Sequence, residues 1–190
     1  MSERSQEGAV SPVSHRVNVS TLPASGRNET IKADAEQRAA LATEHDLLAV
    51  DRFAAEIAVR RWRRDGVRLV GSVDAEITQQ CVVTLEPLTA HLHVPIDAVF
   101  VPDDSALARR MEPGEGADIV VDPEGPDLPE PFASPMLDIG AVAEEFFALA
   151  LDPYPRAPGA EPPEEHAPDP ADAPENPFAA LASLKGNGER

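Results

Sequence analysis

The sequence predicts an α+β domain in which a bent antiparallel sheet, or a partly closed barrel, is flanked by helices and joined to acidic, proline-rich mobile segments. Three runs of alternating apolar and polar residues fall within residues 51–101, and such alternation is typical of half-buried strands. Residues 32–46 and 139–151 have helical patterns. The 190-residue chain also contains 20 prolines and 34 acidic residues, which indicates that part of it does not pack.

The N-terminal part is expected to contain a tail, one strand and one helix. Residues 1–14 are assigned to a disordered tail, and the domain is taken to span 15–156. Residues 15–22 alternate and predict a first strand, which a turn at 23–26 ends. The helix at 32–46 is predicted from its alanines, which favour helix formation.

The three central strands are separated by two turn signals. Asp65-Gly66 is a strong hairpin signal between the first two runs, and Glu86-Pro87 marks the turn before the third. The apolar residues of each run should share one buried face: Phe53, Ala55, Ile57 and Val59; Leu69, Gly71, Val73, Ala75 and Ile77; Leu92, Val94, Ile96, Ala98 and Phe100. Three such strands bury one face when helices cover it.

A long acidic segment precedes the second predicted helix. Residues 102–135 are rich in proline and glycine and are expected to form an acidic loop. Asp138 is a plausible N-cap, and the apolar spacing from 139 to 151 predicts a helix with one buried face. Glu144 and Glu145 are expected on its solvated side.

The C-terminal part is expected to be a linker followed by a short helix. Residues 157–175 consist mainly of Pro, Glu, Asp and Ala, which predicts a solvated linker. The helix at 176–185 would precede a tail at 186–190. Its cap and apolar stripe are predicted to bind a partner through Asn176, Pro177, Phe178, Leu181 and Leu184.

Charge and cysteine content exclude several classes of function. The net charge is −18, which disfavours polyanions and suits a basic protein partner. Residues 102–175 carry nineteen acids and three arginines, so the acidity belongs mainly to the second half. One cysteine, Cys81, excludes an internal disulfide, and no apolar run is long enough for a bilayer. A cytoplasmic protein is expected.

Cys81, His91 and His93 are the candidates for metal or thiol chemistry. A nucleophilic thiol needs a nearby base and a lowered pKa, and structural zinc prefers four organised ligands. The sequence contains no second cysteine, and it lacks phosphate-loop, nucleophile-elbow and metalloprotease motifs. We therefore expect Cys81 to be a buried packing residue, with no metal and no cofactor.

An arginine-rich hairpin is the candidate RNA-binding site. An aromatic side chain between arginines stacks on a base while the guanidinium groups bind phosphates. The alternative is a solvated hairpin end in which the tryptophan packs on arginine side chains. The residues concerned are Arg60, Arg61, Trp62, Arg63, Arg64 and Arg68.

Several motifs, taken in order, resemble the YceD family of large ribosomal RNA subunit accumulation proteins, in a layout similar to its alphaproteobacterial branch. They are QCVVTLEP at 80–87, LDIG at 137–140, DPYP at 152–155 and NPFAAL at 176–181. The family motif includes Cys81, Leu85, Glu86 and Pro87. Many relatives carry a second cysteine where this chain has Thr84.

The resemblance implies a role in the accumulation of large-subunit ribosomal RNA and no established enzymatic activity. We expect a non-enzymatic factor that binds a basic ribosomal protein, precursor rRNA or both, without a membrane or a small-molecule substrate. Two alternatives stay open: a Cys/His metal-dependent or redox module, and an acidic adaptor protein without a ribosomal role.

Overall fold

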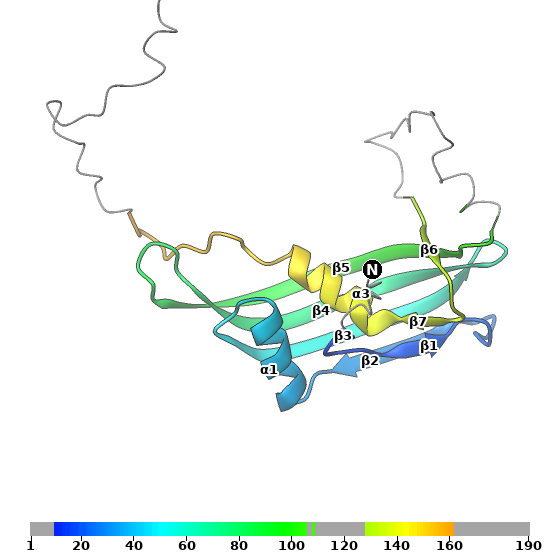
Figure 1. Ribbon diagram of the computed structural model, residues 1–190, viewed down its shortest axis with the longest axis horizontal. Helices are drawn as coiled ribbons and strands as arrows, with labels where there is room; N and C mark the ends of the chain where they lie inside the picture. The colour runs from blue at the N-terminus through cyan, green and yellow to red at the C-terminus, as the bar shows by residue number, and fades with distance from the viewer. Residues whose placement is uncertain (1–9, 106–107, 109–127, 162–190) are drawn as a thin grey trace, which may run out of the picture. The chain divides into compact units, whose positions relative to one another are not determined.

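The structure, a computed structural model, describes residues 10–105, 108 and 128–161 (Figure 1). The chain divides into two units, Met1–Ala157 and Pro158–Arg190, and the helices and strands named here belong to the first. In chain order they are β1 (Arg16–Asn18), β2 (Arg27–Lys32), α1 (Ala35–Glu44), β3 (Ala49–Trp62), β4 (Gly66–Gln80), β5 (Pro87–Pro102), β6 (Glu130–Phe132), β7 (Met136–Asp138) and α3 (Ile139–Leu149).

The larger sheet has five strands in the order β2-β3-β4-β5-β6, and β1 pairs with β7 in a second, two-stranded sheet. Adjacent strands of the larger sheet are antiparallel, except that β5 and β6 are parallel. Strands β2 and β6 are its two edges, so this sheet is open. The α+β prediction is confirmed, whereas the partly closed barrel and the purely antiparallel sheet are wrong.

Strands β3 and β4 form the hairpin that Asp65-Gly66 predicts. Trp62 pairs with Gly66, which leaves Arg63, Arg64 and Asp65 in the turn. A side chain added at Gly66 would begin 2.9 Å from both the Trp62 ring and the Phe100 carbonyl oxygen. Glycine is therefore required at this close approach.

One face of the three long strands is buried, with the predicted alternation. The fully buried side chains of this face include Phe53, Ile57, Leu69, Ile77 and Ile96. His91, His93 and Asp97 are exposed on the opposite face, as the alternation also predicts. Because successive side chains of a strand point to opposite faces of the sheet, one face forms the core and the other is polar and open.

Helices α1 and α3 cover the same face of the larger sheet (Figure 1). His45, the C-cap of α1, makes an edge-to-face contact with Phe147 of α3, with ring centroids 5.5 Å apart. Phe147 makes a second such contact with Phe53 of β3, also at 5.5 Å. Aromatic pairs at this distance and angle add to the free energy gained from burial alone.

Several elements differ from the sequence prediction, and one of them is β7, which pairs with β1 and was not predicted. Strand β2 was not predicted, and the predicted helix at 32–46 is shorter, because Lys32 ends β2 and α1 begins after the Asp34 capping box with Gln37. Strand β6 lies within the predicted loop at 102–135. Because β6 pairs with β5 in parallel, no tight turn joins the two strands, and the sequence therefore has no hairpin signal for β6.

Two buried positions also differ from expectation. Val13, from the predicted tail, is fully buried in the core. Glu144, expected on the solvated side of its helix, is only 7% exposed, and its Oε1 lies 3.0 Å from His45 Nε2. The remaining parts of the predicted tail and loop, the linker beyond residue 161 and the helix at 176–185 lie outside the described residues.

Candidate functional site

The hairpin tip, residues 62–66, presents two arginines to solvent. Arg63 has a left-handed backbone with φ 53°, and its guanidinium carbon lies 4.2 Å from the centroid of the Trp62 ring. This is a cation–π contact within the chain. Arg64 is exposed at the next position. The half-buried Trp62 ring therefore already stacks on an arginine, as one of the two sequence interpretations proposed.

The other three arginines are occupied by contacts within the chain. Arg60 donates to the Asn28 side chain at 2.8 Å and to the Arg27 carbonyl at 3.0 Å. Arg61 donates to the Leu22 carbonyl oxygen through Nη2 at 2.6 Å and Nε at 3.0 Å. These hydrogen bonds attach the hairpin to the preceding segment. Both guanidinium groups therefore have fewer free N–H donors with which to bind phosphate groups.

Arg68 forms a two-pronged ion pair with Asp97 on the neighbouring strand β5. Its Nε lies 2.7 Å from one carboxylate oxygen, and its Nη2 lies 2.5 Å from the other. The hydrogen bond from Arg68 lowers the pKa of Asp97, and the same contact raises that of Arg68. Both groups stay charged at neutral pH and cancel each other, so Arg68 does not reinforce the positive charge of the tip.

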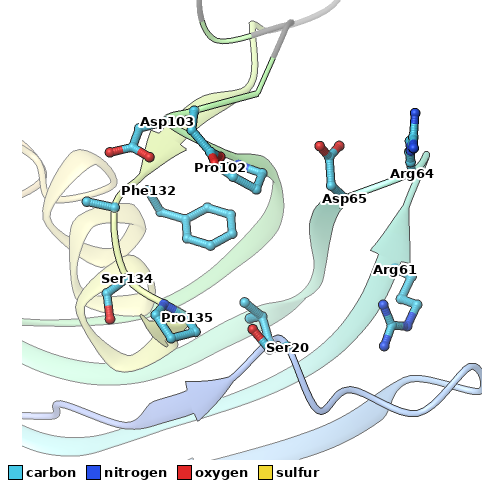
Figure 2. Close-up of a pocket in the computed structure, with 12 residues that line it drawn as sticks. Ser20, Arg61, Arg64, Asp65, Pro102, Asp103, Phe132, Ser134 and Pro135 are labelled. Atoms are coloured by element: carbon cyan, nitrogen blue, oxygen red, sulfur yellow. The ribbon is translucent and has the colours of Figure 1, made fainter.

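A cavity of about 430 Å³ lies beside the hairpin tip. Figure 2 shows Arg61, Arg64 and Asp65 on one side and Asp103, Pro102 and Phe132 across from them. Asp104 and the polar residues Ser20 and Ser134 also line it. Its two guanidinium groups meet three carboxylates, so the cavity is mixed in charge and does not resemble an anion site.

The predicted family motif forms the turn between β4 and β5. Cys81 donates its amide to the Glu86 carbonyl at 2.8 Å, and Leu85 donates to the Cys81 carbonyl at 2.9 Å. Leu85 has a left-handed backbone, φ 60°, and its side chain is 65% exposed. Pro87 begins β5 directly after the turn. We call residues 81–86 the Cys81 turn.

The segment that follows α3 is distant from this turn in sequence but is hydrogen-bonded to it. Val82 donates its amide to the Pro155 carbonyl at 2.9 Å, and Gln79 Nε2 donates to the Asp152 carbonyl at 2.9 Å. The Cys81 sulfur accepts hydrogen bonds from the amides of Thr84 at 3.4 Å and Ala157 at 3.3 Å. The two motifs that are distant in sequence thus form one local structure (Figure 1).

The thiol of Cys81 is fully buried. Hydrogen bonds from the Thr84 side chain and from the backbone of Thr84 and Ala157 lower its pKa to about 6, against the opposing effect of burial. These donors stabilise the thiolate. The geometry makes Cys81 an acceptor at the centre of the turn, and its burial limits access by a substrate.

The metal alternative is tested by the placement of the histidines. His93 Nδ1 lies 3.0 Å from Asp74 Oδ1, and this hydrogen bond lowers the pKa of Asp74. His91 pairs across the strands with Glu76. Among residues 10–105, 108 and 128–161, no group of three or more His, Cys, Asp and Glu side chains is arranged to hold a metal ion.

The LDIG motif has a structural role that sequence reasoning missed in part. Asp138 caps α3 and also accepts hydrogen bonds from the His15 amide, at 2.8 Å, and from the Ser14 hydroxyl. Partial burial raises the pKa of Asp138, but these hydrogen bonds outweigh burial and hold the pKa below its usual value. A Cβ atom on Gly140 would lie 1.9 Å from the Val13 carbonyl oxygen, so this glycine admits the N-terminal segment.

The predicted partner-binding residues of the C-terminal helix lie outside the described residues, so their arrangement stays a prediction. These residues are Asn176, Pro177, Phe178, Leu181 and Leu184. In the part of the chain that the structure describes, no helix is long and apolar enough to cross a membrane.

The chain matches a known family model over more than half of its length. A family model described as large ribosomal RNA subunit accumulation protein YceD matches residues 69–185, which is more than half of the chain. The match includes β4 from Leu69 onward, the Cys81 turn, β5 and α3. No curated protein and no solved structure matches the chain.

Proposed function

The chain belongs to the YceD family of large ribosomal RNA subunit accumulation proteins, and we propose that it acts without catalysis, by binding components of the large subunit during assembly. The family name implies a role in the accumulation of large-subunit ribosomal RNA. The proposal adds the mode of action: contact with a basic ribosomal protein and, to a smaller extent, with precursor rRNA. It places the protein in the cytoplasm.

The preference for a protein partner is supported by the contacts that the hairpin arginines already make within the chain. Arg60, Arg61 and Arg68 already donate to groups within the chain, so Arg63 and Arg64 are the accessible cations of the hairpin tip. Nucleic-acid affinity rises with each phosphate that a cation neutralises. Two cations beside a cavity of mixed charge supply little of that affinity, so we assign RNA a secondary role.

The net charge of −18 supports the same choice. Ribosomal proteins that bind rRNA must be basic, because they neutralise phosphates. A strongly acidic protein attracts such a partner over long range and repels RNA.

The experiment is a comparison of ribosomal RNA in cells with and without the gene. We expect the ratio of large-subunit to small-subunit rRNA to fall when the gene is deleted and to recover when the full-length chain is supplied. A ratio that is unchanged on deletion, under conditions where the gene is normally expressed, would contradict the proposed function.

A further inference from the structure

Three large apolar side chains are exposed where the Cys81 turn meets the segment after α3. Val82 is 45% exposed, Leu85 is 65% exposed and Tyr154 is 70% exposed. The hydrogen bond from Val82 to Pro155 holds the two segments side by side. We call these three residues the apolar patch. It lies at the end of β4 opposite the hairpin tip.

The backbone beneath the patch is fixed by contacts within the chain. The Leu85 amide donates to the Cys81 carbonyl at 2.9 Å, and its own carbonyl accepts from Gln80 Nε2 at 3.1 Å. Leu85 holds a left-handed conformation, φ 60°, which costs a branched apolar residue about 1 kcal/mol or more. The fold thus tolerates a strained backbone at a residue whose large apolar side chain is exposed.

Such an arrangement is typical of a binding surface. Exposed apolar side chains grouped on a rigid support lose little conformational entropy when a partner binds, which increases affinity. A few anchor side chains near the centre of an interface, among which tyrosine is enriched, carry most of its binding free energy. Tyr154 and Leu85 have the size and the exposure that such anchors need.

Acidic residues outnumber basic residues in the segments at this end of the sheet. Glu86 and Asp152 belong to the two segments that form the patch. Arg156 also belongs to the segment after α3, and Arg52 of β3 pairs across the strands with Glu76 of β4. The start of β3 adds Asp51, and the turn before it adds Asp46. Acids are in excess, so the rim favours a partner segment that is itself basic.

We propose that the apolar patch is the docking site for a basic protein segment that inserts an apolar side chain between Leu85 and Tyr154 while its Lys and Arg residues face the acidic rim. The identification of that segment with a large-subunit ribosomal protein rests on the proposed function. Cys81 acts in this account as a positioning residue, because its sulfur fastens both halves of the patch.

The test is site-specific photocrosslinking of the full-length protein. A photoreactive amino acid is placed at Leu85, at Tyr154 or, as a control, at Leu128. Leu128 is 61% exposed and precedes β6, which pairs with the opposite end of β5. The probe is the mixture of proteins extracted from purified large subunits, freed of RNA. We expect positions 85 and 154 to crosslink to the same basic protein, and position 128 at least about tenfold less.

A double variant, Leu85→Ser with Tyr154→Ser, makes the result quantitative. Both side chains are exposed, so folding should be retained, and the affinity for the protein identified by crosslinking should fall by about tenfold or more. Crosslinks to a second copy of this chain, crosslinks to the chain's own residues 176–185, equal labelling from position 128, or unchanged affinity of the double variant would each overturn the proposal.

The two proposals fail in different ways. If the patch is wrong but the function is right, the double variant restores the normal rRNA ratio in cells that lack the gene, as the wild-type chain does. If the function is wrong, deletion of the gene leaves that ratio unchanged, whatever the crosslinking shows.

Discussion

The amide nitrogen of Ala157 lies 3.3 Å from the sulfur of Cys81, a contact between residues 76 positions apart. Thr84 donates to the same sulfur from the other side of the turn. A buried thiol thereby joins two segments that both belong to the matched part of the chain. The contact explains in physical terms why a single cysteine at this position is useful without a metal or a disulfide partner.

The first prediction concerns ionisation of Cys81. Because the Thr84 side chain is the largest cause of the lowered pKa, Thr84→Val should raise the thiol pKa above its wild-type value of about 6. The thiolate absorbance in the ultraviolet, followed against pH, measures this shift. Val82→Thr at an exposed neighbouring position is the control and should leave the midpoint in place. A wild-type midpoint near the ordinary thiol value of about 8.5 would contradict the account.

The same lowered pKa predicts a pH dependence of stability. The folded state favours the thiolate, so this group contributes its full stabilisation above the unfolded pKa of about 8.5, and the contribution is lost as the pH falls to the folded value of about 6. Urea unfolding at several pH values measures it. Cys81→Ala should remove this pH-dependent part, and an identical pH profile for the variant and the wild type would refute it.

The second prediction concerns the buried pair of His45 and Glu144. Removing His45 leaves a carboxylate that is only 7% exposed without its partner, so His45→Ala should lower the free energy of unfolding by about 2 kcal/mol. His93→Ala is the matched control, because the His93–Asp74 pair is exposed and should contribute less than about 1 kcal/mol.

A double-mutant cycle separates the pair from the lost packing. Adding Glu144→Ala to His45→Ala should cost less than the sum of the single changes. Strictly additive losses would show that the two side chains do not interact, which would leave the contact with Phe147 as the link between His45 and α3.

The third prediction concerns Gly140, where the direction of the change in stability on substitution by alanine separates two expectations. Helix propensity alone predicts that Gly140→Ala stabilises the protein by about 1 kcal/mol. The structure predicts the reverse, since the new Cβ would lie 1.9 Å from the Val13 carbonyl oxygen and displace the N-terminal segment. Thermal unfolding measures the sign. A raised midpoint would show that residues 13–15 do not pack against α3 in solution.

The fourth prediction concerns the hairpin tip. Arg63→Glu with Arg64→Glu should weaken any binding to precursor rRNA and reduce its salt slope by about 1.4, the value expected for two phosphate contacts with a single strand. Arg16→Glu with Lys32→Glu makes the same change in charge at exposed positions elsewhere and should have a smaller effect. Equal effects of the two double variants would remove the tip as an RNA contact.

The parts of the fold that the sequence predicted are those with local signals. The hairpin follows from Asp65-Gly66, and α3 follows from Asp138 and its apolar spacing. Strand β2 was missed because, as an edge strand, it buries little beyond Ile31 and shows no alternation. The burial of Glu144 depends on His45, 99 residues earlier, and no local pattern reports such a partner.

For the candidate site, too, the sequence predicted the local features and missed the contacts between distant residues. The sequence identified the arginines of the hairpin, but three of them are occupied by Leu22, Asn28 and Asp97, which lie on other elements. The motif at 80–87 was found from its resemblance to a family, whereas its contact with the segment after α3 required the structure. The Asp34 capping box was a usable signal for the start of α1.

The central claim is that the protein acts by binding large-subunit components, and co-sedimentation tests it most directly. Purified full-length protein is mixed with large-subunit precursors at moderate salt and centrifuged through a sucrose gradient. The account predicts that it migrates with the precursors and that the Leu85→Ser, Tyr154→Ser variant stays largely at the top. Wild-type protein that stays at the top, with precursors from cells lacking the gene in excess, would contradict it.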